Sequence, residues 1–277
     1  MGDDFTMGKF NSMDFNWIGS NENFIDKPNT IKLNSLVIGR YGGNSNAGQF
    51  TIEDGCLVWI SEQEDWEFTL LLDAHNTSES AELIIKEVHM QQSLLEQILS
   101  LPTNHQTFKK LEQKILKMFM AEEFLSACRN IRGETACLIV VRKDKYVWWF
   151  SVGDCVFHLF HQELAAFGQY QINQRHFYEW IGQVNTFEQA VPCYSVGVKE
   201  LRKGENRLFV STDGLFECPN NPYPHPQDIY KSFHDCNDEE GVSSILSHLK
   251  KNNIRDSTTI ITWKVSVSKK ATVPSDQ

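Results

Sequence analysis

The sequence lacks clusters of basic residues: 26 lysines and arginines stand against 36 acidic residues, which gives a formal net charge of −10. A nucleic-acid surface needs grouped positive charge, so we expect no nucleic-acid partner. Long hydrophobic runs are also absent. None approaches the roughly 20 residues of a membrane-spanning helix, and no signal peptide is found, so we expect no membrane partner.

Paired cysteine motifs are absent as well. The seven cysteines include no C-x-x-C pair and form no regular framework, and most of them lie in apolar surroundings. Cysteines of this kind usually act as small buried apolar residues in proteins of a reducing compartment. They provide no zinc-binding pattern. We therefore expect a cytoplasmic protein.

Several ligand-binding motifs fail at one position. Residues 43–48 have the spacing of a phosphate-binding loop, but Gln49 stands where that loop needs a lysine. Residues 235–239 begin like a calcium loop, but Glu240 replaces the glycine of its sharp turn. The patterns G-x-G-x-x-G and H-E-x-x-H do not occur. The sequence therefore argues against a P-loop, a dinucleotide site, an EF-hand and a zinc protease.

What the sequence does contain is a set of strand-like apolar segments, each with an acid at one end. The four segments are 66–72 before Asp73, 147–152 before Asp154, 207–212 before Asp213, and 257–263 after Asp256. A carboxylate at the end of a buried strand must be solvated, paired or bound to a metal, because a bare charge is costly in an apolar interior. Taken singly, each acid can be a solvated turn residue, and that alternative stays open at this point.

The chain divides into one long domain and two short flanks. We expect an irregular extension over residues 1–34, in which only residues 15–18 resemble a short strand, a domain over 35–266 and a polar tail over 267–277. Apolar residues at helical spacing predict helices over about 81–100 and 108–128, and two more around 226–236 and 239–251. Residues 161–200 show no clean period. This order of strands and helices indicates the α+β class, with antiparallel sheets covered by helices.

The strand-end acids favour one kind of chemistry. Carboxylate and carbonyl oxygens are hard ligands that suit Mg²⁺ or Mn²⁺, and no competing histidine and cysteine spacing occurs. Two such ions about 3.5–4 Å apart activate a shared water and stabilise an in-line phosphoryl transfer. That is the strongest reaction class that these acids support.

The order of the segments resembles the metal-dependent protein phosphatases of type 2C, the PPM family. The matching segments, which span residues from about 36 to 265, are 41–54, 73–75, 133–136, 152–154, 211–214 and 255–257. The resemblance implies a four-layer α-β-β-α sandwich, in which two packed antiparallel β-sheets are flanked by helix pairs. It also implies a centre of two Mn²⁺ or Mg²⁺ ions at one edge of the sheets.

Carried over position by position, the resemblance implies a set of metal ligands. Asp73 would bridge both ions, and the carbonyl of Ala74 would bind one of them. Asp213 and Asp256 would complete the other ion's coordination. Asp154 would correspond to a family acid that helps to bind a third, weaker ion.

The resemblance also implies residues that act on water and substrate. Glu53 and Asp54 would hold water molecules around the ions. His75 would be the general acid that protonates the leaving seryl or threonyl oxygen, a role that suits an imidazole titrating near neutrality.

The chain departs from the family pattern around this set. Ala74 replaces a usual glycine, which carries strain if the residue must adopt a positive φ. Asn76 stands where a glycine usually follows the histidine, and Ser257 replaces the usual asparagine, a change we expect to be mild. Gln49 lies in the neighbourhood where the family often has a phosphate-binding arginine, and Arg40 is an upstream candidate for that role.

These observations define three hypotheses. The first is a Mn²⁺/Mg²⁺-dependent phosphatase, monomeric and cytoplasmic, that hydrolyses phosphoserine or phosphothreonine in a phosphorylated protein substrate through an activated water. The second is a phosphatase-fold regulatory or binding protein with weak or no catalysis, which the missing arginine and the altered loop after Asp73 suggest. The third is an unrelated α+β domain whose acids are only turn residues. Coordinates that place Asp73, Asp213 and Asp256 far apart would favour the third.

Overall fold

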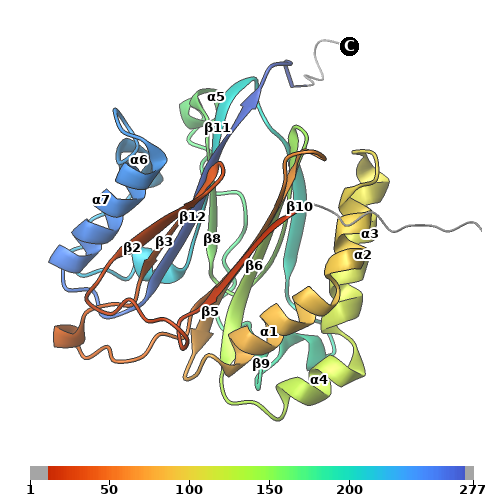
Figure 1. Cartoon of the computed structure of the whole chain (residues 1–277), viewed down its shortest axis with the longest axis horizontal. Coiled ribbons are helices and arrows are strands. Elements are labelled where there is room, and N and C mark those ends of the chain that lie inside the picture. Colours follow the sequence, from red (N-terminus) through yellow and green to blue (C-terminus); the bar gives the residue numbers. More distant parts are fainter. Residues whose placement is uncertain (1–11, 272–277) are drawn as a thin grey trace, which may run out of the picture.

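The protein is described by a computed structural model over residues 12–271. Two antiparallel β-sheets pack face to face, and helices cover the outer face of each sheet (Figure 1). The predicted α+β architecture, a four-layer α-β-β-α sandwich of two packed antiparallel sheets flanked by helices, is confirmed. Hydrophobic side chains alternate along the strands, so each sheet contributes one face to the central core and one face to a helix-facing core.

The larger sheet has seven strands, and its helices come from one stretch of the chain. In spatial order its strands are β1 (Met13–Ile18), β4 (Gly55–Ser61), β5 (Trp66–His75), β6 (Glu134–Lys143), β7 (Tyr146–Val152) and β10 (Ser195–Glu200), with β9 (Ile181–Gly182) also paired to β6. The helices that cover it are α1 (Glu79–Met90), α2 (Gln92–Leu99), α3 (His105–Phe119) and α4 (Glu122–Cys128).

The smaller sheet has five strands. In spatial order they are β2 (Asn29–Leu33), β3 (Leu36–Tyr41), β12 (Thr258–Val267), β11 (Gly204–Ser211) and β8 (Val156–Phe160). Its outer face is covered by α6 (Pro226–Lys231) and α7 (Asp238–Lys251), while the short α5 (Gln162–Ala166) follows β8 (Figure 1). A capping box, in which Asn237 and Glu240 exchange side-chain and backbone hydrogen bonds, begins α7.

Two parts of the sequence prediction need correction. Residues 1–34 are not an irregular extension throughout, because β1 pairs with β4 and β2 pairs with β3, so the domain begins before residue 35. Residues 1–11 and 272–277, which include most of the expected tail, lie outside the described part. The helices expected over 81–100 and 108–128 are each two helices, interrupted at Gln91 and around Met120.

Within residues 12–271, no helix combines the length and apolarity needed to cross a membrane. The longest, α3, has 15 residues and one apolar stripe that packs on the larger sheet.

Candidate active site

The strand ends that carry the predicted acids meet at one end of the sandwich. The antiparallel register sets Gly55 beside Leu72 in the larger sheet and Ser211 beside Ile260 in the smaller one. The start of β4, the end of β5, the end of β11 and the start of β12 therefore share this end. Strand pairing brings these ends together within each sheet, and the packing of the two sheets brings the two pairs of ends together.

Asp73 points into the space between the sheets. Along β5, Leu70 and Leu72 belong to the helix-facing core, whereas Leu71 belongs to the central core. Because side chains alternate along a strand, Asp73 follows Leu71 onto the inner face. Asp73 is buried, so it is not a solvated turn residue.

Asp73, Asp154 and Asp213 form a compact cluster. Each offers one carboxylate oxygen, and these three oxygens lie within 4.8 Å of one another. The backbone N–H of Asp213 donates to Oδ2 of Asp73 over 3.4 Å. A Cβ on Gly214 would lie 2.0 Å from the carbonyl oxygen of Ser257, so only glycine lets the chain after Asp213 approach the start of β12 this closely.

Asp54 and Asp256 lie beside this cluster. Asp54 is buried, and its two carboxylate oxygens accept hydrogen bonds from the hydroxyls of Ser257 and Thr259, each over 2.7 Å. Ser257, which replaces the asparagine usual in the family, thus holds Asp54. Asp256 interacts electrostatically with Asp54 and Asp213.

The pKa values of four of these carboxyls are raised, because burial penalises the charged form and neighbouring acids add repulsion. Burial, and then the charges of Asp54 and Asp213, raise the pKa of Asp256 to about 8. Burial raises the pKa of Asp54 to about 6 against the opposing effect of its two hydroxyl hydrogen bonds. For the same first reason the pKa of Asp73 lies well above its usual range, and that of Asp154 is also raised.

This donor set fits a hard divalent cation. Oδ1 of Asp154 is buried and has no hydrogen-bond partner among the described residues. Three acidic side chains converge here, and one of their buried oxygens has no partner within residues 12–271, so the cluster offers an unused oxygen donor. Mg²⁺ and Mn²⁺ prefer such oxygen donors.

A cavity of about 590 Å³ opens beside the cluster. Its lining includes Ala74, His75, Asp213 and Asp256. The His75 side chain is exposed, and its ring makes an edge contact with Trp180 at 6.4 Å between centroids. The cavity therefore presents an imidazole next to the acids.

The loop after Asp73 adopts a conformation that suits its residues. Ala74 lies inside the extended strand β5, so the alanine carries no left-handed strain. The positive φ, 68°, falls instead at Asn76, and asparagine tolerates this region better than most residues. The departures from the family pattern at these two positions leave the backbone of the site unstrained.

The structure does not support Arg40 as a phosphate ligand. Its side chain is buried, donates to Oδ1 of Asn29 over 2.5 Å, and lies 4.4 Å from the ring centroid of Phe24. Gln49 lines the cavity, but its amide donates to the carbonyl of Thr51 over 2.6 Å. Neither residue offers a cation to the cavity.

One arginine that the sequence reasoning did not single out does line the cavity. Arg255 is exposed, and it is the only lysine or arginine among the lining residues that the structure describes. Its backbone is fixed from two sides. The Asn44 N–H donates to the carbonyl of Ile254 over 2.9 Å, and Gly43, at φ +80°, leaves room for the Arg255 carbonyl, which a Cβ would approach to 2.0 Å.

Glu53 also lines the cavity, where it accepts a hydrogen bond from Thr51 over 2.5 Å. Glu217 is an acid that the sequence reasoning missed. It lies on the same cavity wall, and burial together with the charge of Asp213 raises its pKa. Its position four residues after Asp213 gave no strand-end pattern from which to find it.

Arg175 is the second residue that the sequence reasoning missed. It comes from the segment without a clean period, and its guanidinium Nη2 lies 3.6 Å from Oδ2 of Asp213 and 3.9 Å from Oδ2 of Asp154. Its Nε donates to the backbone carbonyl of Asp154 over 2.9 Å. The cluster is thus approached by one cation of the protein itself.

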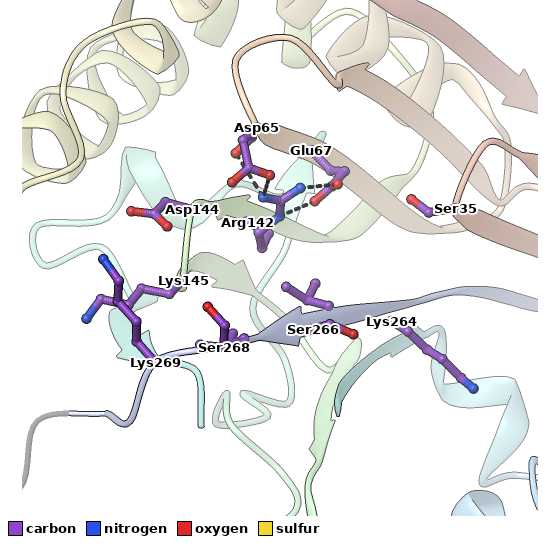
Figure 2. A pocket seen from close by; sticks show the side chains of 12 residues that line it. Ser35, Asp65, Glu67, Arg142, Asp144, Lys145, Lys264, Ser266, Ser268 and Lys269 are labelled. Carbon is purple, nitrogen blue, oxygen red and sulfur yellow. Dashed lines mark hydrogen bonds and ion pairs between the residues drawn. The ribbon is translucent and has the colours of Figure 1, made fainter. Parts of the chain in front are cut away.

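At the opposite end of the sandwich, acidic side chains are paired with an arginine, unlike Asp73. A cavity of about 420 Å³ lies there between the sheets. Figure 2 shows Arg142 bridging Asp65 and Glu67, and its Nε donates to Glu67 over 2.5 Å. Arg142 and Glu67 are both buried, so a guanidinium neutralises the buried carboxylate directly. Asp73 has no such partner in the described part of the chain.

Comparison of the structure with solved structures identifies protein phosphatases. A bacterial serine phosphatase has a TM-score of 0.62 at 15% identity, covering 85% of this chain and 99% of its own. The serine/threonine phosphatase Stp1 from Staphylococcus aureus has a TM-score of 0.61 at 12% identity, covering 94% of this chain and 96% of its own. RsbX in complex with magnesium has a TM-score of 0.56 at 14% identity, covering 86% of this chain and all, 100%, of its own.

No protein-family model matches the sequence, and no curated protein matches it. At these low identities the structural likeness establishes the fold, and the resemblance to type 2C phosphatases is confirmed at that level. A shared fold does not fix the chemistry, which depends on the residues of the site.

Proposed function

We propose that this protein is a Mn²⁺- or Mg²⁺-dependent phosphatase that acts on phosphoserine or phosphothreonine in a protein substrate. The observation that carries the proposal is the convergence of carboxylate oxygens of Asp73, Asp154 and Asp213 within 4.8 Å of one another. This cluster adjoins a cavity whose lining includes Asp213 and His75. The phosphatase fold supports this chemistry by analogy with the solved phosphatases. The seven free thiols fit a reducing compartment, and we place the protein in the cytoplasm.

In this proposal, two ions are held by the carboxylates of Asp73, Asp213 and Asp256 and by the carbonyl of Ala74. When bound, the ions lower the pKa of water and stabilise charge on the phosphoryl group. Asp54 orders the base of the site, because both of its oxygens are fixed by hydroxyls of β12 and its neighbour Ser257. Glu53, at the cavity wall, orients water.

His75 donates a proton to the leaving oxygen of the seryl or threonyl side chain. Its exposed imidazole lies in the cavity, and the edge contact with Trp180 restricts the orientation of the ring. A donor is needed because an alkoxide is a poor leaving group, and an imidazole exchanges protons near neutral pH.

Arg255 supplies the positive charge that Gln49 does not. It lines the cavity on a fixed backbone, and no carboxylate within residues 12–271 forms an ion pair with it. A guanidinium presents several N–H donors to phosphate oxygens in one plane. We assign it to the substrate phosphate.

A second candidate function is a catalytically silent binding protein of this fold. It is favoured by the absence of a cation at Gln49 and by the presence of Arg175 beside the acids. This candidate binds a metal ion or a phosphorylated partner without turnover.

The test is phosphate release from an aryl phosphate and from a phosphoserine peptide, measured with the purified full chain and added Mn²⁺. Activity that disappears in Asp73→Asn and persists in Asp144→Asn supports the enzyme. Asp144 is a matched control because it is exposed in a remote turn, and its positive φ, 52°, is one that asparagine accepts. Mn²⁺ binding without activity above Asp73→Asn supports the binding protein instead.

A further inference from the structure

Arg175 is held beside the acid cluster by contacts on several sides. Its Nε donates to the carbonyl of Asp154 over 2.9 Å. Its guanidinium carbon lies 4.8 Å from the ring centroid of Phe177 and 5.8 Å from that of Phe216. The chain that carries it is also anchored, because the N–H of His176 donates to the carbonyl of Gly153 over 2.8 Å. The guanidinium therefore has a defined position rather than a free surface location.

The two carboxylates that Arg175 approaches are shared with the cluster. Nη2 lies within 4.0 Å of Oδ2 of both Asp213 and Asp154, at 3.6 and 3.9 Å. Oδ1 of Asp154, by contrast, is buried and has no hydrogen-bond partner within residues 12–271. The cluster is thus divided: one side keeps a carboxylate oxygen without a partner, and the other side already faces a positive charge.

A divalent cation needs its oxygen donors at about 2.0–2.6 Å. An ion that used Oδ2 of Asp154 and Oδ2 of Asp213 together would enter the space that the guanidinium faces. It would have to displace Arg175 or tolerate a like charge at close range, and both reduce its affinity. The side chain of Arg175 is only 23% exposed, so water screens this repulsion incompletely.

We infer that Arg175 is a built-in cation that closes the Asp154–Asp213 side of the cluster to a further metal ion. The chain then holds fewer divalent ions than its carboxylates would otherwise bind, and Asp154 anchors an arginine on the side where a third ion would lie. The expectation that Asp154 helps to bind a third ion is replaced by this assignment. The inference rests on the proposed metal centre for its biological meaning, but its test counts ions directly.

The test is the number of Mn²⁺ ions bound per full-length chain, measured by calorimetric titration and by native mass spectrometry with Mn²⁺ alone. The variant is Arg175→Met, which removes the charge and keeps an unbranched side chain. The matched control is Arg202→Met. Arg202 has a similar exposure of 28% and pairs with Glu163 over 2.7 Å, with no contact to the acid cluster.

We expect Arg175→Met to bind one more Mn²⁺ per chain than the wild type, while Arg202→Met binds the wild-type number. An unchanged count in Arg175→Met overturns the inference, and so does an equal gain in Arg202→Met, which would reflect net charge alone. Arg175→Gln, checked for folding by circular dichroism, replaces the methionine variant if the latter does not fold.

The same experiment separates this inference from the proposed function. A wild-type chain that binds no Mn²⁺ counts against the proposed metal-dependent phosphatase. If Arg175→Met then gains an ion, the closing role of Arg175 still holds. If neither chain binds Mn²⁺, both the function and the inference fail.

Discussion

The backbone N–H of Asp213 donates to the carboxylate of Asp73 although 140 positions separate the two residues in the sequence. The contact joins the end of β5 in one sheet to the turn after β11 in the other. It places a backbone dipole on a carboxylate that has no Lys or Arg partner in the described residues. The two sheets are therefore linked at this end by the residues to which we assign metal binding.

Replacing Asp73 by asparagine separates two effects of this carboxylate: it binds metal, and without metal it destabilises the folded protein. We expect Asp73→Asn to lose phosphatase activity by at least about 100-fold and to lose the stabilisation that Mn²⁺ gives the wild type, because binding to the folded state raises stability. Without metal, the variant should be more stable than the wild type, because a buried acid with neighbouring acids is removed.

Thermal unfolding with and without Mn²⁺ measures both effects. Each kcal/mol should appear as a shift in Tm of about 2–4 °C for a chain of this size. Asp144→Asn serves as the control and should behave as the wild type. A destabilised metal-free Asp73→Asn would contradict the assignment of Asp73 as an uncompensated buried acid.

The raised pKa values predict how the stability of the metal-free protein depends on pH. The pKa of Asp256 is about 8 and that of Asp54 about 6, both above the ordinary value of 3.8. Between about pH 4 and pH 8 the folded state therefore binds more protons than the unfolded state at these groups. Their contribution to the free energy of unfolding is greatest at low pH and is lost as the pH rises toward 8.

This prediction is checked by comparing Asp256→Asn with the wild type in the presence of a chelator. The asparagine variant cannot ionise, so its Tm relative to the wild type should increase steadily from pH 5 to pH 8.5. Taking the difference removes the titration of groups that both proteins share. A difference in Tm that stays constant or decreases with pH would show that the pKa of Asp256 is not raised.

Asp73, Asp213 and Asp256 could be singled out from the sequence because each lies at one end of an apolar run. Alternation along β5 places Leu71 in the core and Asp73 on the same face. Antiparallel pairing aligns the strand ends within each sheet, and the packing of the two sheets brings both sets to one end of the sandwich. The residues that were missed lack such a local pattern. Arg175 owes its position to Asp154 and to the rings of Phe177 and Phe216, which no local period reveals.

β2 was missed, and β1 was recognised only over residues 15–18, for a related reason. β1 and β2 lie at the edges of their sheets, and each has several exposed or partly exposed positions, so their hydrophobic alternation is weak. Arg40 was misjudged because the sequence shows its distance along the chain from Glu53 but not the aromatic rings that enclose it. Long-range packing decides both cases.

His75 provides a test that depends on the leaving group. We expect His75→Asn to slow hydrolysis of a phosphoserine peptide by about 100-fold or more, because general acid catalysis typically contributes 10²–10⁴-fold. Hydrolysis of p-nitrophenyl phosphate should fall much less, because its leaving phenolate needs no proton. Both substrates are assayed at saturating Mn²⁺. Equal losses on the two substrates would indicate that His75 positions the site rather than donating a proton.

Arg255 provides the last test, because it is the cation that lines the cavity in place of Gln49. Hydrogen bonds to charged groups are worth about 1.5–3 kcal/mol, so Arg255→Ala should raise the KM for an aryl phosphate about 10- to 100-fold with a smaller change in kcat. Arg202→Ala, remote from the cavity, should leave both constants unchanged.

A rescue experiment completes this test. Gln49 and Arg255 line the same cavity, so Gln49→Arg in the Arg255→Ala background introduces a guanidinium into that lining. We expect this second substitution to lower the raised KM at least part of the way toward the wild-type value. The reason is that phosphate recognition depends on a planar cation within reach of the metal centre. An Arg255→Ala protein with wild-type KM would mean that the phosphate is held by the ions and backbone donors alone. The absence of a cation at Gln49 would then no longer favour a catalytically silent binding protein, because catalysis would not need a cation there.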